Sequence, residues 1–167
     1  MTADPTPGNI RLTTADWHFD RFDAVLAVLQ AAFALQPRET DPPSSAHAET
    51  VESLAAHAAK GGLVIAERDD RPVGCVFFRE EPDSLYLHKL AVDPVVRDQG
   101  LARRLVDAVA AEAVRRGHGR LTLSTRKALP ENVALFERLG FRKTGEGTHP
   151  GYSAPTFWKM ARQLAPE

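Results

Sequence analysis

The chain has 167 residues, of which 43% are hydrophobic and 26% are charged, and its formal net charge is −1. These values are ordinary for a globular protein, so we expect residues 1–167 to form a single domain. A charge this close to zero gives no indication of nucleic acid or an anionic membrane as a partner. The single cysteine, Cys75, excludes an intramolecular disulfide and a multi-cysteine zinc site.

The sequence also lacks the signals of membrane and secreted proteins. No stretch approaches the ~20 consecutive apolar residues that a membrane span needs. Met1–Arg11 has neither the basic cluster nor the apolar stretch of a secretory signal. We expect a cytoplasmic protein, monomeric or homodimeric, that binds no metal ion. Cys75 lies in an apolar run, and we interpret it as a small buried residue rather than a nucleophile.

The first part of the chain predicts one short strand and two helices. Asn9–Thr13 could form the strand. Apolar residues recur at helical spacing in Asp20–Leu35, which predicts an amphipathic helix. Prolines interrupt the segment 36–45, which we expect to be a loop. Ser45 is expected to cap a second helix, Ala46–Lys60, which ends at a pair of glycines.

Three β-type runs follow, and short polar turns separate them. The predicted strands are Leu63–Glu67, Val73–Phe78 and Leu85–Val92. Consecutive strands joined by tight turns must pair antiparallel.

The rest of the chain alternates between helices and strands. The predicted elements are a helix over Gly100–Arg116, a strand over Arg120–Thr125, a helix over Pro130–Leu139 and strands over Phe141–Thr144 and Thr156–Met160. A strand–helix–strand unit makes Leu85–Val92 and Arg120–Thr125 parallel neighbours. We therefore predict a mixed α/β fold, with a mostly antiparallel sheet flanked by helices in the order β-α-α-β-β-β-α-β-α-β-β. Ligands of such sheets bind at the carboxyl ends of the parallel strands.

The segment Val92–Ala102 connects the first of these parallel strands to the long helix, and its composition suits a diphosphate. The start of a helix leaves N–H groups unpaired and carries a partial positive charge. Gly100 would let the backbone approach a phosphate closely, and Arg97 and Arg103 add positive potential. The segment lacks the sequence of a P-loop and the three glycines of a dinucleotide-binding loop. An ordinary strand-to-helix connection would explain a single glycine equally well.

Three motifs resemble one protein family. Arg97-x-x-Gly100-x-Ala102 matches the Gln/Arg-x-x-Gly-x-Gly/Ala signature of the GCN5-related N-acetyltransferases. Leu90–Pro94 resembles the end of that family's fourth strand, directly before the signature. Glu131-Asn132 and Phe136–Phe141 resemble its Asn-containing helix and the Leu-Gly-Phe that ends it. The predicted element order agrees with the family's, and the strong resemblance covers about residues 62–163.

The resemblance implies an N-acetyltransferase that uses acetyl-coenzyme A as its acyl donor. The backbone of Leu90, Ala91 and Val92 is then expected to pair with the pantetheine arm, and the amides of Gln99–Arg103 are expected to hold the pyrophosphate. Asn132 would contact the coenzyme, and Phe136 would pack near its thioester end. The complete set of implied coenzyme-binding residues is Leu90, Ala91, Val92, Arg97, Asp98, Gln99, Gly100, Leu101, Ala102, Arg103, Asn132 and Phe136.

Acyl transfer from a thioester to an amine by direct attack requires a neutral amine and a donor for the oxyanion, and an acid can supply a proton to the departing thiolate. Strand alternation places Tyr86, His88, Leu90 and Val92 on one face of the strand. His88, with an ordinary pKa of ~6.5, could deprotonate the amine through a water molecule, or could simply face solvent. Tyr86-Leu-His88 resembles the arylalkylamine branch of the family, which has a His-x-His pair, with Tyr86 in place of the first histidine.

The identity of the thiolate's acid is open, because this chain has Phe136 where many family members have a tyrosine. Tyr152 and Tyr86 are candidates, although Tyr152 could equally be an ordinary loop residue. The thiolate could also leave unassisted. The resemblance implies that the amide of Leu90 serves the oxyanion.

The acceptor cannot be read from the sequence. Polar candidates for its site, none of which we assign a role, are Asp41, Ser44, Ser45, Glu80, Glu81 and His149. The leading hypothesis is a primary amine of a small molecule. The alternatives are an amine of a protein or peptide, and a non-catalytic sensor that binds acyl-coenzyme A.

Overall fold

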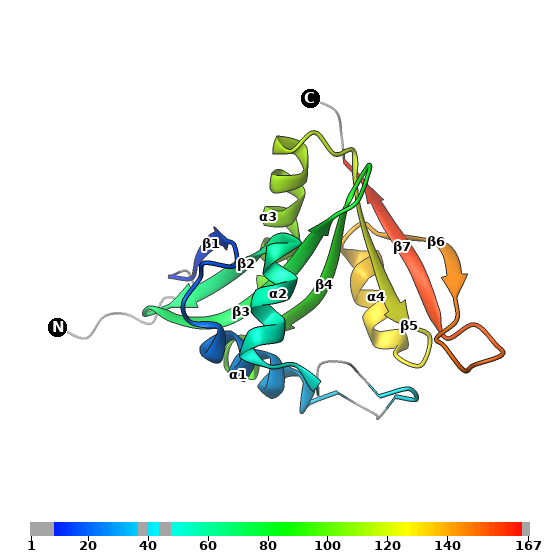
Figure 1. Cartoon of the computed structure of the whole chain (residues 1–167), viewed down its shortest axis with the longest axis horizontal. Coiled ribbons are helices and arrows are strands. Elements are labelled where there is room, and N and C mark those ends of the chain that lie inside the picture. The colour runs from blue at the N-terminus through cyan, green and yellow to red at the C-terminus, as the bar shows by residue number, and fades with distance from the viewer. Residues whose placement is uncertain (1–8, 37–39, 44–47, 165–167) are drawn as a thin grey trace.

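The computed structural model describes residues 9–36, 40–43 and 48–164 of the chain, which contain seven strands and four α-helices (Figure 1). In chain order these are β1 (Arg11–Ala15), α1 (Phe22–Phe33), α2 (Val51–Ala59), β2 (Gly61–Arg68), β3 (Arg71–Glu80), β4 (Leu85–Val92), a 3₁₀ turn (Pro94–Val96), α3 (Leu101–Arg115), β5 (Arg120–Arg126), α4 (Pro130–Arg138), β6 (Arg142–Gly147) and β7 (Phe157–Gln163). The strands form one sheet in the order β1-β2-β3-β4-β5-β7-β6. β4 and β5 are parallel, and every other neighbouring pair is antiparallel. The predicted fold class, element order and parallel pair are confirmed.

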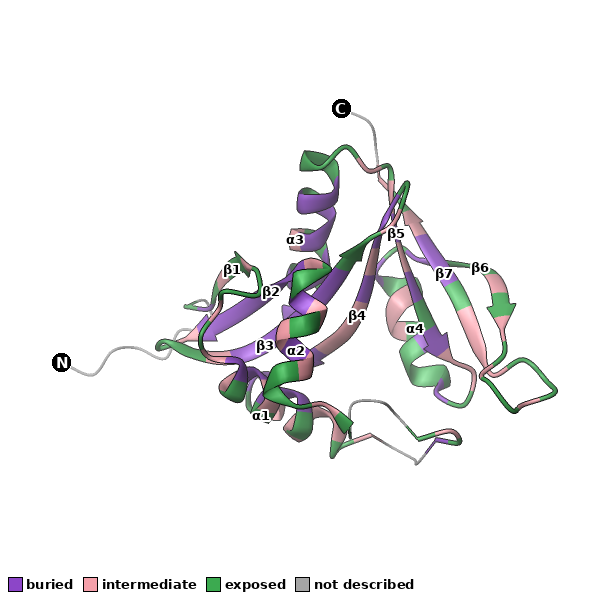
Figure 2. Cartoon of the chain, in the orientation of Figure 1, coloured by how far each residue is buried: buried purple, intermediate pink, exposed green. Residues whose placement is uncertain are grey.

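Helices cover both faces of the sheet, which is why β2 and β3 are apolar and buried along their central residues. Leu63 and Ile65 pack on one face, in a core cluster with residues of α1 and α2. Val64 and Ala66 point to the other face, in a cluster with residues of α3 and α4. Figure 2 shows that burial is concentrated in the central strands and on the helix surfaces that face them.

A β-bulge interrupts β4 at Lys89. Phe77 of β3 pairs with His88 and Cys75 with Ala91, so one residue of β3 lies opposite two of β4. Lys89 has a φ of 54°, in the left-handed region that residues with a side chain seldom adopt. The extra residue reverses the side-chain alternation beyond it.

The bulge contradicts the prediction that alternate residues of β4 share one face. His88 contacts the ring of His57 on α2, whereas Leu90 and Val92, beyond the bulge, pack against the core cluster of α3. Simple alternation fails here because the sequence does not mark the inserted residue.

β4 and β5 pair only at their beginning. In the described part of the chain their register comprises Leu85 with Leu121 and Tyr86 with Thr122. Beyond this point the two strands diverge, and Figure 1 shows the sheet split into two wings. The β5-facing edge of β4 therefore has backbone groups available for another partner.

The largest boundary error concerns the second helix, which begins at Val51 instead of Ala46. Thr50 caps it, because the Thr50 and Ser53 side chains each accept a hydrogen bond from the other residue's backbone N–H. The predicted cap, Ser45, lies outside the described residues. The predicted glycine pair opens β2, where a Cβ on Gly61 would lie 2.2 Å from the carbonyl oxygen of Phe78.

The smaller boundary shifts occur at strands near the ends of the chain. β1 spans Arg11–Ala15 rather than Asn9–Thr13, β6 extends to Gly147, and β7 continues to Gln163. Backbone pairing with a neighbouring strand extends these elements through residues that have little apolar character.

We predict that Leu105→Ala lowers the free energy of unfolding by about 2–5 kcal/mol, because it opens a cavity at a fully buried position of α3. Val114→Ala on the same helix is the control. Its side chain is 42% exposed, and we expect a change within about 0.5 kcal/mol. Denaturant unfolding of both variants measures the difference, and equal effects would contradict the assignment of Leu105 to the core.

Candidate active site

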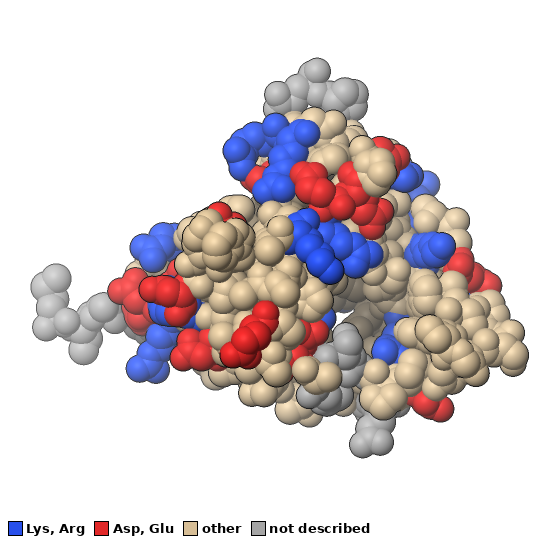
Figure 3. All heavy atoms as spheres, viewed as in Figure 1, with Lys and Arg blue, Asp and Glu red and all other residues tan. Residues whose placement is uncertain are grey.

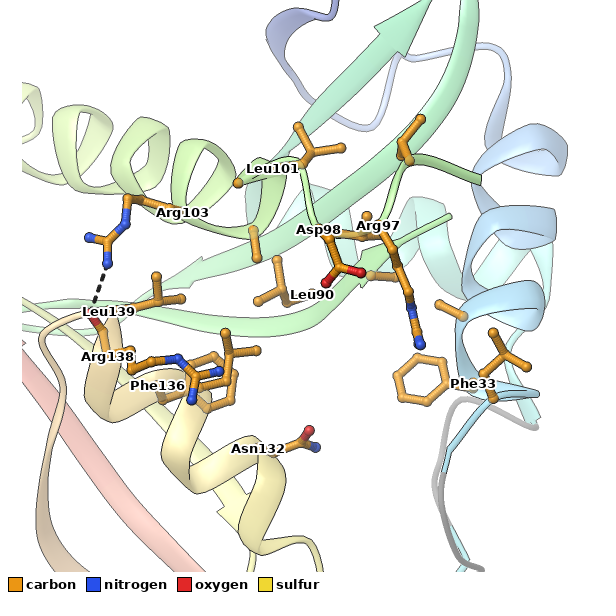
Figure 4. Close-up of a pocket in the computed structure, with 18 of the residues that line it drawn as sticks. Phe33, Leu90, Arg97, Asp98, Leu101, Arg103, Asn132, Phe136, Arg138 and Leu139 are labelled. Atoms are coloured by element: carbon orange, nitrogen blue, oxygen red, sulfur yellow. Dashed lines mark hydrogen bonds between the residues drawn. The ribbon is translucent and has the colours of Figure 1, made fainter. Parts of the chain in front are cut away.

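A cavity of about 560 Å³ lies between the beginning of α3, the bulged part of β4 and the ends of α1 and α4 (Figure 4). Every residue predicted to bind the coenzyme lines it except Gln99, which is exposed. The structure thus brings together Leu90–Val92, the loop before α3, and Asn132 and Phe136 of α4, although about 40 residues separate them in the sequence. Their binding of a coenzyme remains a prediction.

The first turn of α3 opens onto this cavity. The amides of Leu101, Ala102 and Arg103 have no carbonyl one turn earlier in the helix and concentrate partial positive charge there. Gly100 precedes them with a φ of 72°, and a Cβ built on it meets no atom within 4 Å. The backbone conformation favours glycine, and the space in front of it can hold an anion.

Most of the charged side chains around the cavity are cationic. Arg97 reaches across it toward Phe33 of α1 (Figure 4). The guanidinium of Arg103 donates a 2.9 Å hydrogen bond to the carbonyl of Arg138, and this bond ties α3 to the end of α4. The described residues contribute one carboxylate to the lining, that of Asp98. Three guanidiniums and a helix N-terminus make this end of the site suited to a diphosphate.

Sequence reasoning missed the contribution of α1. Phe33, Leu35 and Gln36 line the cavity at the end of this helix, and Leu35 is 50% exposed. The helical spacing of apolar residues predicted only an amphipathic helix here, without a role in binding. An apolar residue just before a proline-rich loop could have indicated an exposed binding surface.

A second cavity of about 170 Å³ lies between the diverging strands β4 and β5. It adjoins the first cavity, and the two, together called the cleft, share the lining residues Phe33, Gln36, Leu90, Asn132 and Phe136. His88 and Lys89 line it from β4, and Arg126 from β5. The cleft therefore has one end at the first turn of α3 and the other between the two wings of the sheet.

The imidazole of His88 lies among the rings of His57, Phe77 and Tyr86, with centroid distances of 5.3, 5.9 and 6.1 Å. Its Nε2 atom is buried and has no hydrogen-bond partner within the described residues. Burial, assisted by the positive charge of Lys89, lowers the pKa of His88 to about 3. This imidazole is neutral at physiological pH and therefore has one N–H donor and one acceptor nitrogen.

A buried ion pair holds the bulge against α2. The Nζ of Lys89 lies 2.9 Å from Oε1 of Glu49, and these side chains are only 10% and 7% exposed. Ser53 and His57 of α2 also contact the Glu49 carboxylate. Burial raises the pKa of Glu49, but the hydrogen bonds from Ser53 and Lys89 outweigh it and the net shift is downward. Sequence reasoning missed this pair, because nothing local connects residues 40 positions apart.

Neither candidate tyrosine lines the cleft. The Arg79 guanidinium stacks on the ring of Tyr86 at 4.1 Å. The Tyr152 hydroxyl donates a hydrogen bond to Asp41 between α1 and α2, and this bond raises the pKa of Tyr152. That either tyrosine protonates the thiolate stays a prediction, and neither side chain lies at the cleft.

The polar residues considered for the acceptor have other partners. Glu80 contacts Arg116 and His118, Glu81 lies 3.7 Å from Arg79, and His149 contacts Thr156. Asp41 accepts the hydrogen bond of Tyr152. Ser44 and Ser45 lie outside the described residues.

Cys75 is fully buried, as predicted, and burial raises the pKa of its thiol to about 12. Its Sγ donates to the carbonyl of Lys89 at 3.6 Å, so this thiol contacts the bulge. Within residues 9–36, 40–43 and 48–164, no three His, Cys, Asp or Glu side chains are grouped as metal ligands. None of the helices in these ranges has the length and apolar character needed to cross a membrane.

Comparison with solved structures supports the fold. The ribosomal-protein-S18-alanine N-acetyltransferase of Escherichia coli superposes with a TM-score of 0.72 and 20% identity, over 95% of this chain and 96% of the other. The PaiA N-acetyltransferase of Thermoplasma acidophilum, solved with coenzyme A, gives a TM-score of 0.76 at 11% identity, over 92% and 98% of the two chains.

Comparison of sequences finds shorter matches. Human N-acetyltransferase 8B is 33% identical over 88 residues, which is 49% of this chain and 39% of the human protein. The ribosomal protein bS18-alanine N-acetyltransferase of Escherichia coli K12 is 38% identical over 61 residues, 36% of this chain and 41% of that enzyme. The match thus spans about two fifths of each relative. The model of the acetyltransferase (GNAT) family matches residues 24–141, and the chain therefore belongs to this family.

Proposed function

We propose that this protein transfers an acetyl group from acetyl-coenzyme A to a primary amine of a small molecule, by direct attack within a ternary complex. The observation that carries the proposal is the pair of adjoining cavities, which place an anion-binding helix end next to a smaller cavity lined by His88. Family membership and the coenzyme A complexes of structures with this fold support the choice of donor.

The residues of the first cavity fit the donor. The amides of α3's first turn, with Arg97 and Arg103, would hold the diphosphate. The unpaired edge of β4 would hydrogen-bond the amide groups of the pantetheine arm as an added strand does. Bound this way, the arm would extend along β4 toward His88, and the Leu90 amide could donate to the thioester oxygen.

The reaction needs little from the protein beyond positioning. The amine nitrogen attacks the thioester carbon, the C–S bond breaks, and the proton that the amine loses balances the charge on the thiolate. Holding both reactants in one cleft supplies much of the acceleration. We propose that the neutral His88 accepts a hydrogen bond from the incoming amine and orients its lone pair. With a pKa of about 3, it would hold the proton only transiently.

Acetyl-coenzyme A and a panel of amines test this function. We expect free thiol to be released with at least one small primary amine, faster than hydrolysis without an amine. A peptide that begins with alanine belongs in the panel, because the Escherichia coli relative is named for that activity. Exclusive turnover of the peptide would favour the protein-acetylating alternative. Tight coenzyme binding without any turnover would favour the sensor.

We predict that Gly100→Glu weakens acetyl-coenzyme A binding at least about a hundredfold, because a carboxylate beside two phosphates costs several kcal/mol. The control is Gly117→Glu after the other end of α3. Gly117 also has a positive φ, of 84°, and open space around it, so backbone strain is matched. Calorimetric titration of both variants measures the effect. Equal binding by the two would show that the diphosphate lies elsewhere.

We predict that kcat/KM rises with pH between 5 and 9 in proportion to the neutral fraction of the acceptor amine, without a break near pH 6.5. The reason is that a histidine with a pKa lowered to about 3 stays neutral throughout this range. His88→Ala should reduce kcat about tenfold to a hundredfold and leave the Kd for the coenzyme unchanged.

His18→Ala is the control for His88→Ala, because the exposed His18 contacts Asp16 and lines neither cavity. A pH profile of the unaltered protein with an ionisation near 6.5 that disappears in His88→Ala would contradict the neutral role and restore His88 as an ordinary general base.

A further inference from the structure

The acceptor end of the cleft has an excess of positive charge. Among the described residues, Lys89 and Arg126 are the charged side chains that line it, and no Asp or Glu side chain does so. Figure 3 shows the hollow between the two wings of the molecule, with basic atoms beside it. The positive charge of Lys89 is neutralised by the Glu49 carboxylate, which lies 2.9 Å from Nζ of Lys89. Arg126 is the charge that remains to be explained.

Arg126 is the last residue of β5, and its guanidinium bridges the cleft to the segment before α2. Its two terminal nitrogens donate to the carbonyls of Pro42 and Pro43, at 2.6 and 3.1 Å. Both partners are neutral, and no salt bridge to Arg126 occurs within the described ranges. Burial lowers the pKa of Arg126, which is the direction expected for a charge without a carboxylate close by.

A half-buried guanidinium that has no carboxylate partner among the described residues favours an anion beside it. A guanidinium has five N–H donors, and two carbonyl contacts leave several of them unused. A carboxylate is the group whose geometry matches these donors, and pairing offsets the cost of burying the charge. A polycationic acceptor would instead meet two cations and no carboxylate.

We propose that the acceptor is a small primary amine that itself carries a carboxylate, as an amino acid does, and that Arg126 binds this carboxylate while His88 contacts the amine. This proposal rests on the proposed function and narrows its substrate class. Both side chains line the same small cavity between β4 and β5, so one compact molecule can contact them together.

Amino acids and their own amides, compared at equal concentrations of neutral amine, test the proposal. The two members of each pair differ only in the carboxylate. We expect kcat/KM to be at least about tenfold higher for the acid, the effect of one hydrogen bond to a charged group. Arg126→Gln should remove this preference by lowering the value for the acid and leaving that for the amide nearly unchanged.

Arg120→Gln is the matched control, since Arg120 lies at the other end of β5 and pairs with Asp83. It should leave the preference intact. Arg126→Lys keeps a positive charge and should retain part of the preference for the acid. If Arg126→Gln does not fold, the ratio of kcat/KM for acid and amide in the unaltered protein tests the proposal.

Two outcomes would overturn the proposal while the proposed function stands. One is turnover of amides or polyamines at least as fast as acids. The other is an equal loss for acid and amide in Arg126→Gln, which would make Arg126 only a clamp on Pro42 and Pro43. Absence of thiol release with every amine would instead reject the function itself.

Discussion

The bulge at Lys89 is the constraint on which the rest of the site depends. β4 and β5 separate after Tyr86, and beyond the bulge β4 turns Leu90 and Val92 toward α3, so the sheet opens into a cleft at this part of β4. The same divergence leaves one edge of β4 without a strand partner. Unpaired backbone groups inside a protein are costly unless a ligand or water satisfies them, and this edge is therefore suited to binding an extended molecule.

Keeping the bulge in place has a cost, which neighbouring elements offset. A lysine in the left-handed region is strained by about 1 kcal/mol or more, and its ammonium is nearly buried. Glu49, positioned by the capped start of α2, neutralises that ammonium, while the Cys75 thiol contacts the carbonyl of Lys89. Breaking one side of such a pair would leave a buried charge. The start of α2 thus stabilises the bulge in β4, although the two are far apart in the sequence.

The sequence was informative where structure is local and silent where it depends on distant partners. The bounds of β4 were predicted from its apolar run. The glycine at the start of α3 was predicted from the signals of a helix start. The bulge was not, because Lys89 looks like any strand residue and is held by Glu49. The lowered pKa of His88 could not be predicted either, since its largest cause is burial of the ring, which packs against His57 of α2.

Charge is distributed unequally along the cleft, and this distribution bears on how the reaction is controlled. Cations and a helix N-terminus gather where a diphosphate would lie, whereas at the other end the ring of His88 is neutral and Lys89 and Arg126 line the same cavity. An ammonium would meet these two cations and a neutral imidazole there, whereas a free amine retains a lone pair and loses little hydration. The cleft would therefore select the reactive form of the acceptor by excluding its charged form. A protein that lowers an imidazole's pKa by burial can select a neutral nucleophile without a general base whose own pKa lies near neutrality.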